Sequence, residues 1–163
     1  MKSPCLAFVM LSLAACSITP AAVRELREPE QYEGDDILLR NHDVAHVVVA
    51  EAFITPSTPE DNIDSPASWM QDGRRMLVAT AKATDQLVVY DGDTGQRLRT
   101  VGGTRTALGQ LQRPNGVATI DDRYLFVVEP DNHRVQMFQL PGFTPLLAFG
   151  DDGLQQPYGL WVQ

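Results

Sequence analysis

From residue 64 onward the chain alternates short apolar runs with clusters of turn-forming residues. The stretch 66–91 aligns on the stretch 114–139 without a gap, 48 positions later. Each unit contains four runs, which in the second unit are GVATI, YLFVVE, RVQMF and PLLAFG. The 3.6-residue apolar period of helices does not occur in these units. Four short strands in a repeat of about 40–50 residues are typical of a β-propeller blade.

The pattern therefore predicts an all-β fold, a partial β-propeller with two four-stranded blades and the start of a third. We expect blade 1 at about 64–103, blade 2 at about 112–151, and the first strand of a third blade at 157–163. The valine-rich run 43–53 predicts a further strand ahead of the first blade. Because two open blades leave strand edges unpaired, we expect the chain to be the N-terminal part of a longer reading frame or the product of a truncated gene.

The N-terminal residues predict export. Cys5–Leu13 is an apolar run of the length found in secretory signals, too short to span a membrane, and it leads into LAAC at 13–16. That tetrapeptide resembles the lipobox of bacterial lipoproteins, where cleavage precedes the cysteine and its thiol takes a diacylglycerol. The alternative is an ordinary signal peptide cut near Ala21. We thus expect a signal peptide at 1–15, a lipid anchor on Cys16, a tether at 16–42 and the partial propeller at 43–163.

The composition excludes some classes of binding partner and some kinds of site. The net charge of −8, from 13 basic and 21 acidic residues, argues against a nucleic-acid partner, which needs a basic surface. The two cysteines, Cys5 and Cys16, both precede the predicted fold, so it contains no thiol for a disulfide, a thiolate metal site or a nucleophile. We expect contact with a membrane only through the lipid anchor, at the cell envelope, with the outer membrane favoured because Ser17 follows the cysteine.

The topology of a blade sorts the charged residues. Consecutive strands are antiparallel, so the connection between the second and third strands emerges at the same end as the linker to the next blade. Carboxylates and cations meet at that end, where calcium and phosphate could be held together. The polar residues expected there are Asp61, Asp64, Lys82, Asp85, Arg105, Arg113, Asn115, Glu129, Asp131, Asn132, His133 and Arg134.

The stretch PNGVA at 114–118, followed by DNHRVQMF at 131–138, resembles the signature of NHL repeats. Two interpretations of Asp131 to Arg134 stay open. In the first, the Asp and Asn close a turn through hydrogen bonds from side chain to backbone, while the His and Arg brace neighbouring blades. In the second, the four residues form part of a catalytic cluster or a metal site.

Ahead of the first repeat stands VVVAEAFITPSTPEDNIDSPASWM, a valine run, an acidic Thr/Pro stretch and then Asp-x-Pro-Ala-x-Trp. This order, continued by LVATAKATDQLVVYD, resembles the N-terminal region of the β-propeller phytases, calcium-dependent 3-phytases. The terminal PYGLWVQ is similar to a strand of the same family. The likeness spans about residues 44–163 and is most specific at the first repeat. It implies a secreted phosphoric monoester hydrolase acting on inositol hexakisphosphate (phytate).

The resemblance places Lys82 on a phosphate-contacting, catalytic lysine and Asp64 on a calcium-associated acidic position, with Asp61 as a second metal candidate. Ser65 replaces an aspartate of the family motif, which removes one potential ligand. Arg113 and Arg134 are further candidates for phosphate, on their expected location and without a motif match. The alternative function is a non-catalytic NHL-type propeller lipoprotein that binds a protein or envelope ligand. We expect this chain alone to be inactive on phytate.

Overall fold

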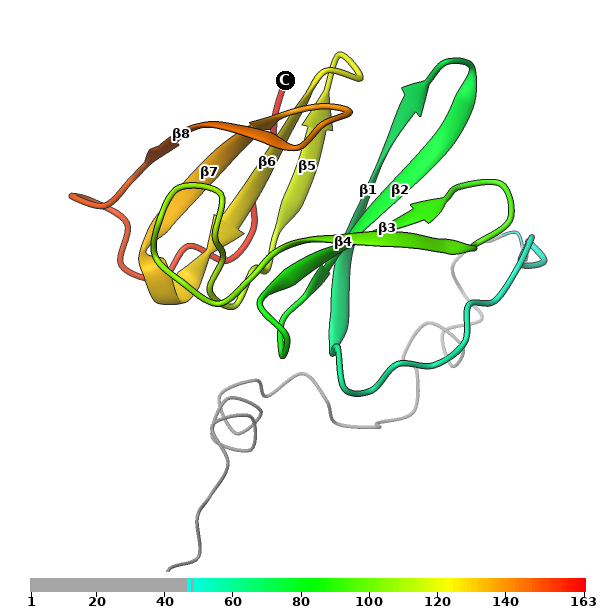
Figure 1. The fold of residues 1–163 in the computed structure, drawn as a ribbon, viewed down its shortest axis with the longest axis horizontal. Coiled ribbons are helices and arrows are strands. Elements are labelled where there is room, and N and C mark those ends of the chain that lie inside the picture. Colours follow the sequence, from blue (N-terminus) through cyan, green and yellow to red (C-terminus); the bar gives the residue numbers. More distant parts are fainter. Residues whose placement is uncertain (1–46, 48) are drawn as a thin grey trace, which may run out of the picture. The chain divides into compact units, whose positions relative to one another are not determined.

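The structure is a computed structural model that describes residues 47 and 49–163. The first four strands form one antiparallel sheet (Figure 1). Sheet 1 consists, in order across the sheet, of β1 (Ile63–Gln71), β2 (Arg74–Ala81), β3 (Gln86–Asp91) and β4 (Arg97–Gly102). The β1–β2 connection is Asp72-Gly73, and both residues have positive φ. An Asp-Gly pair adopts this conformation readily, and two-residue hairpin turns require it.

The next four strands form a second antiparallel sheet. Sheet 2 consists of β5 (Val117–Ile120), β6 (Tyr124–Glu129), β7 (Arg134–Gln139) and β8 (Thr144–Phe149), again in chain order. A single turn of 3₁₀ helix, η1 (Pro130–Asn132), connects β6 to β7 and ends at His133, whose φ of 54° is left-handed. The all-β prediction with two four-stranded antiparallel sheets is thus confirmed.

The internal repeat seen in the sequence is also a repeat of strand register. Val78 pairs with Val89 in sheet 1, and 48 positions later Phe126 pairs with Met137 in sheet 2. The register shift that follows Val89 in the β3–β4 pair returns after Met137 in the β7–β8 pair. The last three strands of the two sheets therefore share one register at a displacement of 48 residues, whereas β5 and β6 are shorter than β1 and β2.

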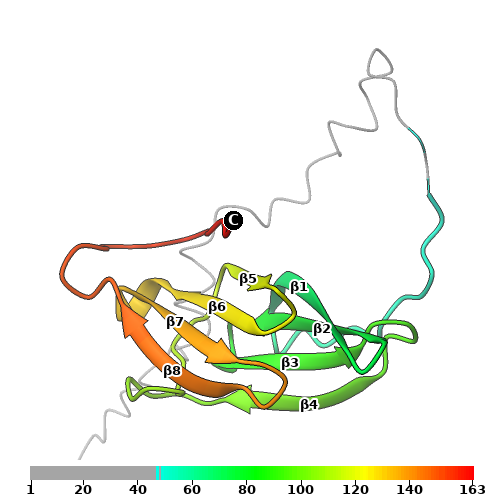
Figure 2. The same cartoon turned by 90° about the horizontal axis from the view of Figure 1, so that it is seen from above.

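The apolar core lies between the two sheets, which lie next to each other in one compact unit (Figure 2). Polar contacts join the sheets as well: the Thr119 hydroxyl donates to the Ser68 carbonyl at 2.6 Å, and the Met70 N–H donates to the Asp122 carboxylate at 2.8 Å. The buried core residues are Trp69, Val78, Leu87 and Val89 of sheet 1, Leu125, Val127, Phe138, Leu140 and Phe143 of the second repeat, and Leu111 of the linker.

Two segments with strand-like sequences form no strand. The strand predicted at 43–53 is wrong for residues 49–53, and residues 43–46 and 48 lie outside the described part. Val47 and Val49 are more than four-fifths exposed, and strand propensity needs a neighbouring strand and a packed face to take effect. Residues 157–163, expected to begin a third blade, are also without strand structure.

The predicted signal peptide, Cys16 and the tether lie outside the described residues. Within residues 47 and 49–163, no helix is long and apolar enough to cross a membrane.

Candidate functional site

One end of the two sheets carries most of the charged residues that the sequence singled out, and we call it the loop end. It is formed by the β2–β3 connection (82–85), the β6–β7 connection (130–133) and the linker between the sheets (103–116). Gln86 pairs with Gly102, which brings the start of the linker beside the β2–β3 connection. The Val128 N–H donates to the Gly116 carbonyl, which brings the end of the linker beside the β6–β7 connection.

Lys82 and Asp64 meet at the loop end. Lys82 follows the last residue of β2, Ala81, which pairs with Ile63, and this register places Asp64 alongside. The Lys82 Nζ lies 2.8 Å from an Asp64 carboxylate oxygen, and the Lys82 side chain is 5% exposed. The same ammonium lies 5.7 Å from the centre of the Tyr158 ring. A buried ammonium needs such partners, because leaving water disfavours its charge.

Asp85 and Arg113 tie the first sheet to the linker. The Asp85 carboxylate accepts a 2.7 Å hydrogen bond from the backbone N–H of Arg113. Both residues have positive φ, a backbone conformation uncommon outside glycine. The Arg113 guanidinium in turn lies 3.8 Å from the carboxylate of Asp131, in the β6–β7 connection. Arg113 therefore lies at the loop end, as predicted, and forms an ion pair there.

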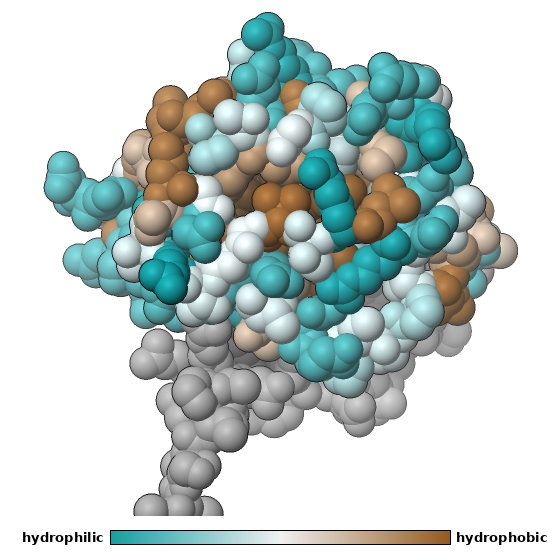
Figure 3. All heavy atoms as spheres, in the orientation of Figure 1, coloured by the Kyte–Doolittle hydropathy of each residue, from teal (hydrophilic) through white to brown (hydrophobic). Residues whose placement is uncertain are grey.

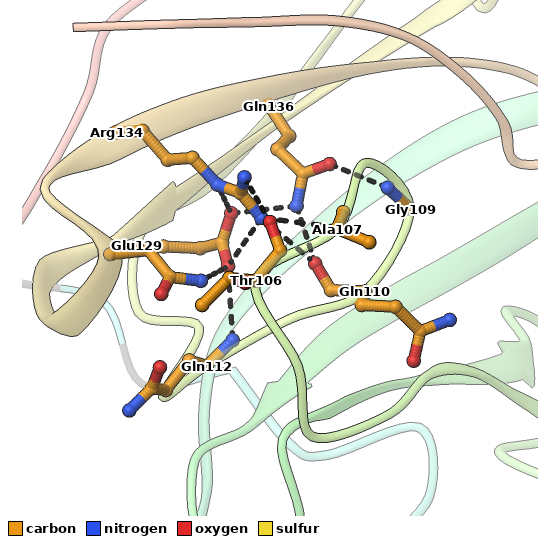
Figure 4. Close-up of polar contacts among 9 residues, drawn as sticks. Thr106, Ala107, Gly109, Gln110, Gln112, Glu129, Arg134 and Gln136 are labelled. Atoms are coloured by element: carbon orange, nitrogen blue, oxygen red, sulfur yellow. Dashed lines mark hydrogen bonds and ion pairs between the residues drawn. The ribbon is translucent and has the colours of Figure 1, made fainter. Parts of the chain in front are cut away.

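Glu129 and Arg134 form the centre of a buried polar network (Figure 4). The Glu129 carboxylate is fully buried and accepts hydrogen bonds from the Arg134 guanidinium at 2.8 Å and from the Gln136 amide at 2.6 Å. It also accepts from the Gln112 backbone N–H and the Asn132 side-chain amide. One carboxylate thus holds β6, β7, the 3₁₀ turn and the linker together.

Arg134 and Gln136 hold the linker by its backbone. The Arg134 guanidinium donates to the carbonyl of Thr106 at 2.6 Å and to that of Gln110 at 3.2 Å. The Gln136 amide donates to the Gln110 carbonyl and accepts from the Gly109 N–H. These bonds hold the backbone of the linker beside β7. The role of Arg134 in phosphate binding stays a prediction, and its guanidinium donates hydrogen bonds to carbonyl groups of the linker.

Each of the four side chains of Asp131 to Arg134 contacts another part of the chain. Asp131 pairs with Arg113, Asn132 donates to Glu129, and Arg134 donates to the linker. His133 Nδ1 makes a hydrogen-bond contact with the Gln155 carbonyl, in the segment that follows β8. Beside His133 lies an open depression lined by residues 151–156.

Asp61 is engaged by an arginine that is distant in the sequence. Its carboxylate lies 2.6 Å from the Arg97 guanidinium and accepts a hydrogen bond from the Thr84 hydroxyl at 3.2 Å. Burial raises the pKa of Asp61, but the hydrogen bond and charge of Arg97, with the hydroxyls of Thr84 and Thr58, outweigh it and bring the pKa below 3.8. The carboxylate is therefore ionised at neutral pH and faces a cation of the protein.

The lowered pKa predicts how stability depends on pH. The contribution of ionised Asp61 is complete above the pKa of the unfolded chain, near 3.8, and disappears as the pH falls through the lower folded-state value. The wild type is expected to exceed the Asp61→Asn variant in the free energy of unfolding at pH 7, with the difference shrinking below about pH 4. Denaturant unfolding across pH measures this. An exposed control, Asp93→Asn, should match the wild type, and a difference for Asp61→Asn that grows in acid would contradict the assignment.

The residues predicted to hold calcium do not form a calcium site by themselves. Ca²⁺ takes about six to eight oxygen ligands. The Asp61 carboxylate faces Arg97, and the Asp64 carboxylate faces Lys82. Across residues 47 and 49–163, no group of three or more His, Cys, Asp or Glu side chains is placed to hold a metal ion. The involvement of calcium stays a prediction from the resemblance.

The sequence did not predict the structural role of three residues in this region. Glu129 was placed correctly at the loop end, but nothing in its position at the close of an apolar strand indicated a fully buried carboxylate. Gln136 has the alternation of a solvent-facing strand residue, yet it is fully buried. Tyr158, whose carbonyl accepts from the Gly116 N–H, lies beside Lys82 only because the chain after β8 returns to the loop end.

Comparison with known proteins gives a distant structural likeness. No protein-family model matches the chain, and no curated protein matches it. Among solved structures it is similar to hydrazine synthase of Kuenenia stuttgartiensis, with 15% sequence identity and a TM-score of 0.47 over 65% of this chain. The chain spans 27% of the length of that protein.

Proposed function

We propose that the loop end binds a phosphorylated small molecule, and that the chain is the N-terminal part of a phytase-like phosphoric monoester hydrolase. The observation that carries this proposal is the Lys82–Asp64 contact, in which the two residues named by the resemblance lie 2.8 Å apart at the same end of sheet 1. Arg113 supplies a second cation at that end. The candidate ligand is inositol hexakisphosphate, and Cys16 would anchor the chain to the bacterial envelope.

Lys82 would act on a phosphate as a fixed positive charge. An ammonium that is almost removed from water interacts more strongly with an anion than an exposed one does. A phosphate oxygen that reaches Nζ competes with the Asp64 carboxylate, so binding depends on which anion the ammonium prefers. In a hydrolase, the same charge would stabilise the negative charge that develops on the transferring phosphoryl group.

Substitution of Lys82 tests the proposal. The Lys82→Gln variant is expected to bind inositol hexakisphosphate about ten-fold more weakly or worse, since a charge-assisted hydrogen bond contributes roughly 1.5–3 kcal/mol. Isothermal titration calorimetry measures the affinity, with unphosphorylated inositol as the blank. Arg123→Gln, in the exposed β5–β6 turn at the opposite end of sheet 2, removes the same charge and should bind like the wild type.

Substitution of Asp64 distinguishes direct phosphate binding by Lys82 from phosphate binding that depends on calcium. Without calcium, Asp64→Asn is expected to bind the ligand more tightly, because the variant frees Lys82 from its competing anion. If Asp64 instead serves as a calcium ligand, the variant loses the part of the affinity that calcium adds. Equal losses in Lys82→Gln and Arg123→Gln, or no binding by the wild type, would overturn the proposal.

A second candidate function rests on a different observation. The four side chains of Asp131 to Arg134 contact the linker, Arg113, Glu129 and the segment after β8. Because these side chains are engaged in contacts within the chain, they favour a non-catalytic NHL-type scaffold that presents its loops to a protein or envelope ligand. A wild-type chain that folds but takes up no inositol hexakisphosphate, with or without calcium, would favour this scaffold over the hydrolase.

A further inference from the structure

Asn115, in the linker at the loop end, has a buried side chain without a hydrogen-bond partner. The residue is 1% exposed, and neither its Oδ1 nor its Nδ2 atom has a partner among residues 47 and 49–163. Buried polar atoms of native proteins nearly always have one, because a group that leaves water unpaired costs free energy. The indole N–H of Trp69 is also unpaired, but its ring packs in the apolar core. Asn115 has no comparable apolar surface, so its burial needs another explanation.

The internal repeat shows that the fold does not need an amide at this position. Displacement by 48 residues carries Ala67 to Asn115, and a proline precedes both residues. Ala67 packs against the apolar core. Asparagine is favoured in turns because its side chain can bond to the nearby backbone, but the Asn115 side chain makes no such bond. Only its backbone N–H is used in the sheet, where it donates to the Val128 carbonyl at 2.9 Å.

Asn115 belongs to the same part of the loop end as the buried cation Lys82. It directly precedes Gly116, whose N–H donates to the Tyr158 carbonyl at 3.1 Å. The Tyr158 ring in turn lies 5.7 Å from the Lys82 Nζ. Asn115 leads into β5, which lies against β1, on the opposite edge of sheet 2 from β8, where Figure 3 shows apolar side chains gathered. The unpaired amide therefore lies on the edge of sheet 2 that adjoins sheet 1, and Tyr158 connects it to Lys82.

The free amide indicates which ligand group fits it. A side-chain amide offers two N–H donors and one carbonyl acceptor. A phosphate dianion offers acceptors alone and would leave Oδ1 unpaired, whereas a hydroxyl both donates and accepts. We propose that the Asn115 amide binds a hydroxyl group of the molecule whose phosphate meets Lys82. This role for Asn115 rests on the proposed function and makes the residue a determinant of ligand specificity.

The ligand class that satisfies both groups is a polyol that carries a phosphate and a free hydroxyl. Inositol hexakisphosphate has no free hydroxyl. Hydrolysis of one of its phosphate esters consumes a water molecule, releases inorganic phosphate and leaves a hydroxyl on the ring. A site that bonds a hydroxyl discriminates against an analogue that lacks it, because the polar groups of the site then stay unpaired. The loop end is therefore expected to prefer partly phosphorylated inositols over the hexakisphosphate.

The segment after β8 covers this part of the loop end. A Cβ atom at position 116 would lie 2.8 Å from the Tyr158 carbonyl oxygen and 3.0 Å from the Gly159 Cα, so glycine lets the segment pack directly on the linker. Asn115 and Lys82 are 1% and 4% exposed. Residues 157–163 form no strand. Ligand entry is therefore expected to displace the segment around Tyr158.

Isothermal titration calorimetry of the full chain, in a buffer with a calcium chelator, tests the preference. The probes are inositol hexakisphosphate and the inositol pentakisphosphates, each with one free hydroxyl. At least one pentakisphosphate is expected to bind the wild type about ten-fold more tightly than the hexakisphosphate despite its lower charge, because it gives the amide its hydrogen bonds. Asn115→Leu and Asn115→Ala, the second matching Ala67, should lose this preference. Gln139→Leu, which removes an exposed amide at the other end of sheet 2, should keep it.

Urea unfolding provides a readout that a purely structural role would move in the opposite direction. Leucine is similar in size to asparagine and removes the unpaired atoms, so the unfolding midpoint of Asn115→Leu should equal or exceed that of the wild type. A buried water could instead satisfy the amide. Asn115→Leu would then lower the midpoint and leave the ligand preference unchanged, and that result would overturn the proposal.

Lys82→Gln separates failure of this role from failure of the proposed function. A wild type that binds no inositol phosphate overturns the proposed function, and the role of Asn115 with it. If Lys82→Gln weakens the binding of every inositol phosphate, the proposed function stands. In that case, a wild type that prefers the hexakisphosphate, or a preference that survives both Asn115 variants, overturns the role of Asn115 alone.

Discussion

Replacing Glu129 with alanine is expected to lower the free energy of unfolding by about 3–5 kcal/mol, the usual cost of leaving a buried charge without its partner. The carboxylate is fully buried and accepts from the Arg134 guanidinium at 2.8 Å. Its removal leaves that guanidinium, 7% exposed as a residue, with only carbonyl partners. The Gln112 N–H and the Asn132 amide lose their acceptor as well.

Urea unfolding followed by circular dichroism measures this change. Glu60→Ala, at an exposed position ahead of sheet 1, provides the matched control and should change stability by no more than about 0.5 kcal/mol. The linker should also become more accessible, so amide exchange at Gly109 and Gln112 is expected to accelerate in Glu129→Ala. Equal stability of the two variants would show that the network contributes little to the fold.

The second large effect concerns the contact between the sheets. Trp69→Ala is expected to cost about 3–5 kcal/mol, as large-to-small substitutions in cores do. Trp69 is 2% exposed, lies in the core between the sheets and meets the Phe143 ring edge-on at 5.7 Å. Because it packs against both repeats, its loss leaves a cavity at the point where the sheets depend on each other.

The chain contains its own control, because the second of its two tryptophans, Trp161, is 86% exposed. Trp161→Ala should leave the free energy of unfolding within about 0.5 kcal/mol of the wild type. Trp69→Phe should cost less than Trp69→Ala, because phenylalanine leaves the smaller cavity. Both variants remove the indole N–H, which is buried without a hydrogen-bond partner. Similar losses for Trp69→Ala and Trp161→Ala would contradict the described core.

The candidate site could be located from the sequence but not resolved into contacts. Antiparallel connectivity alone places the residues around 82–85 and 130–134 at one end of the sheets, and Lys82 and Asp64 meet there. The partners of the remaining charges could not be predicted. Asp61 pairs with Arg97, 36 positions away, and Glu129 accepts from Gln112, 17 positions away. Such contacts depend on the path of the linker and the reach of long side chains, which strand periodicity does not encode.

By itself the sequence determined that this chain forms two repeated four-stranded antiparallel sheets, since apolar alternation and turn residues act over a few neighbouring positions. The tertiary structure decided where those rules fail. Residues 49–53 and 157–163 carry strand-like patterns but form no strand, because a strand exists only where another backbone supplies its hydrogen bonds. The tertiary structure also determined that most charged side chains of the loop end lie against a group of opposite charge. A carboxylate or guanidinium that leaves water needs such a partner, and only the folded chain brings the two groups together.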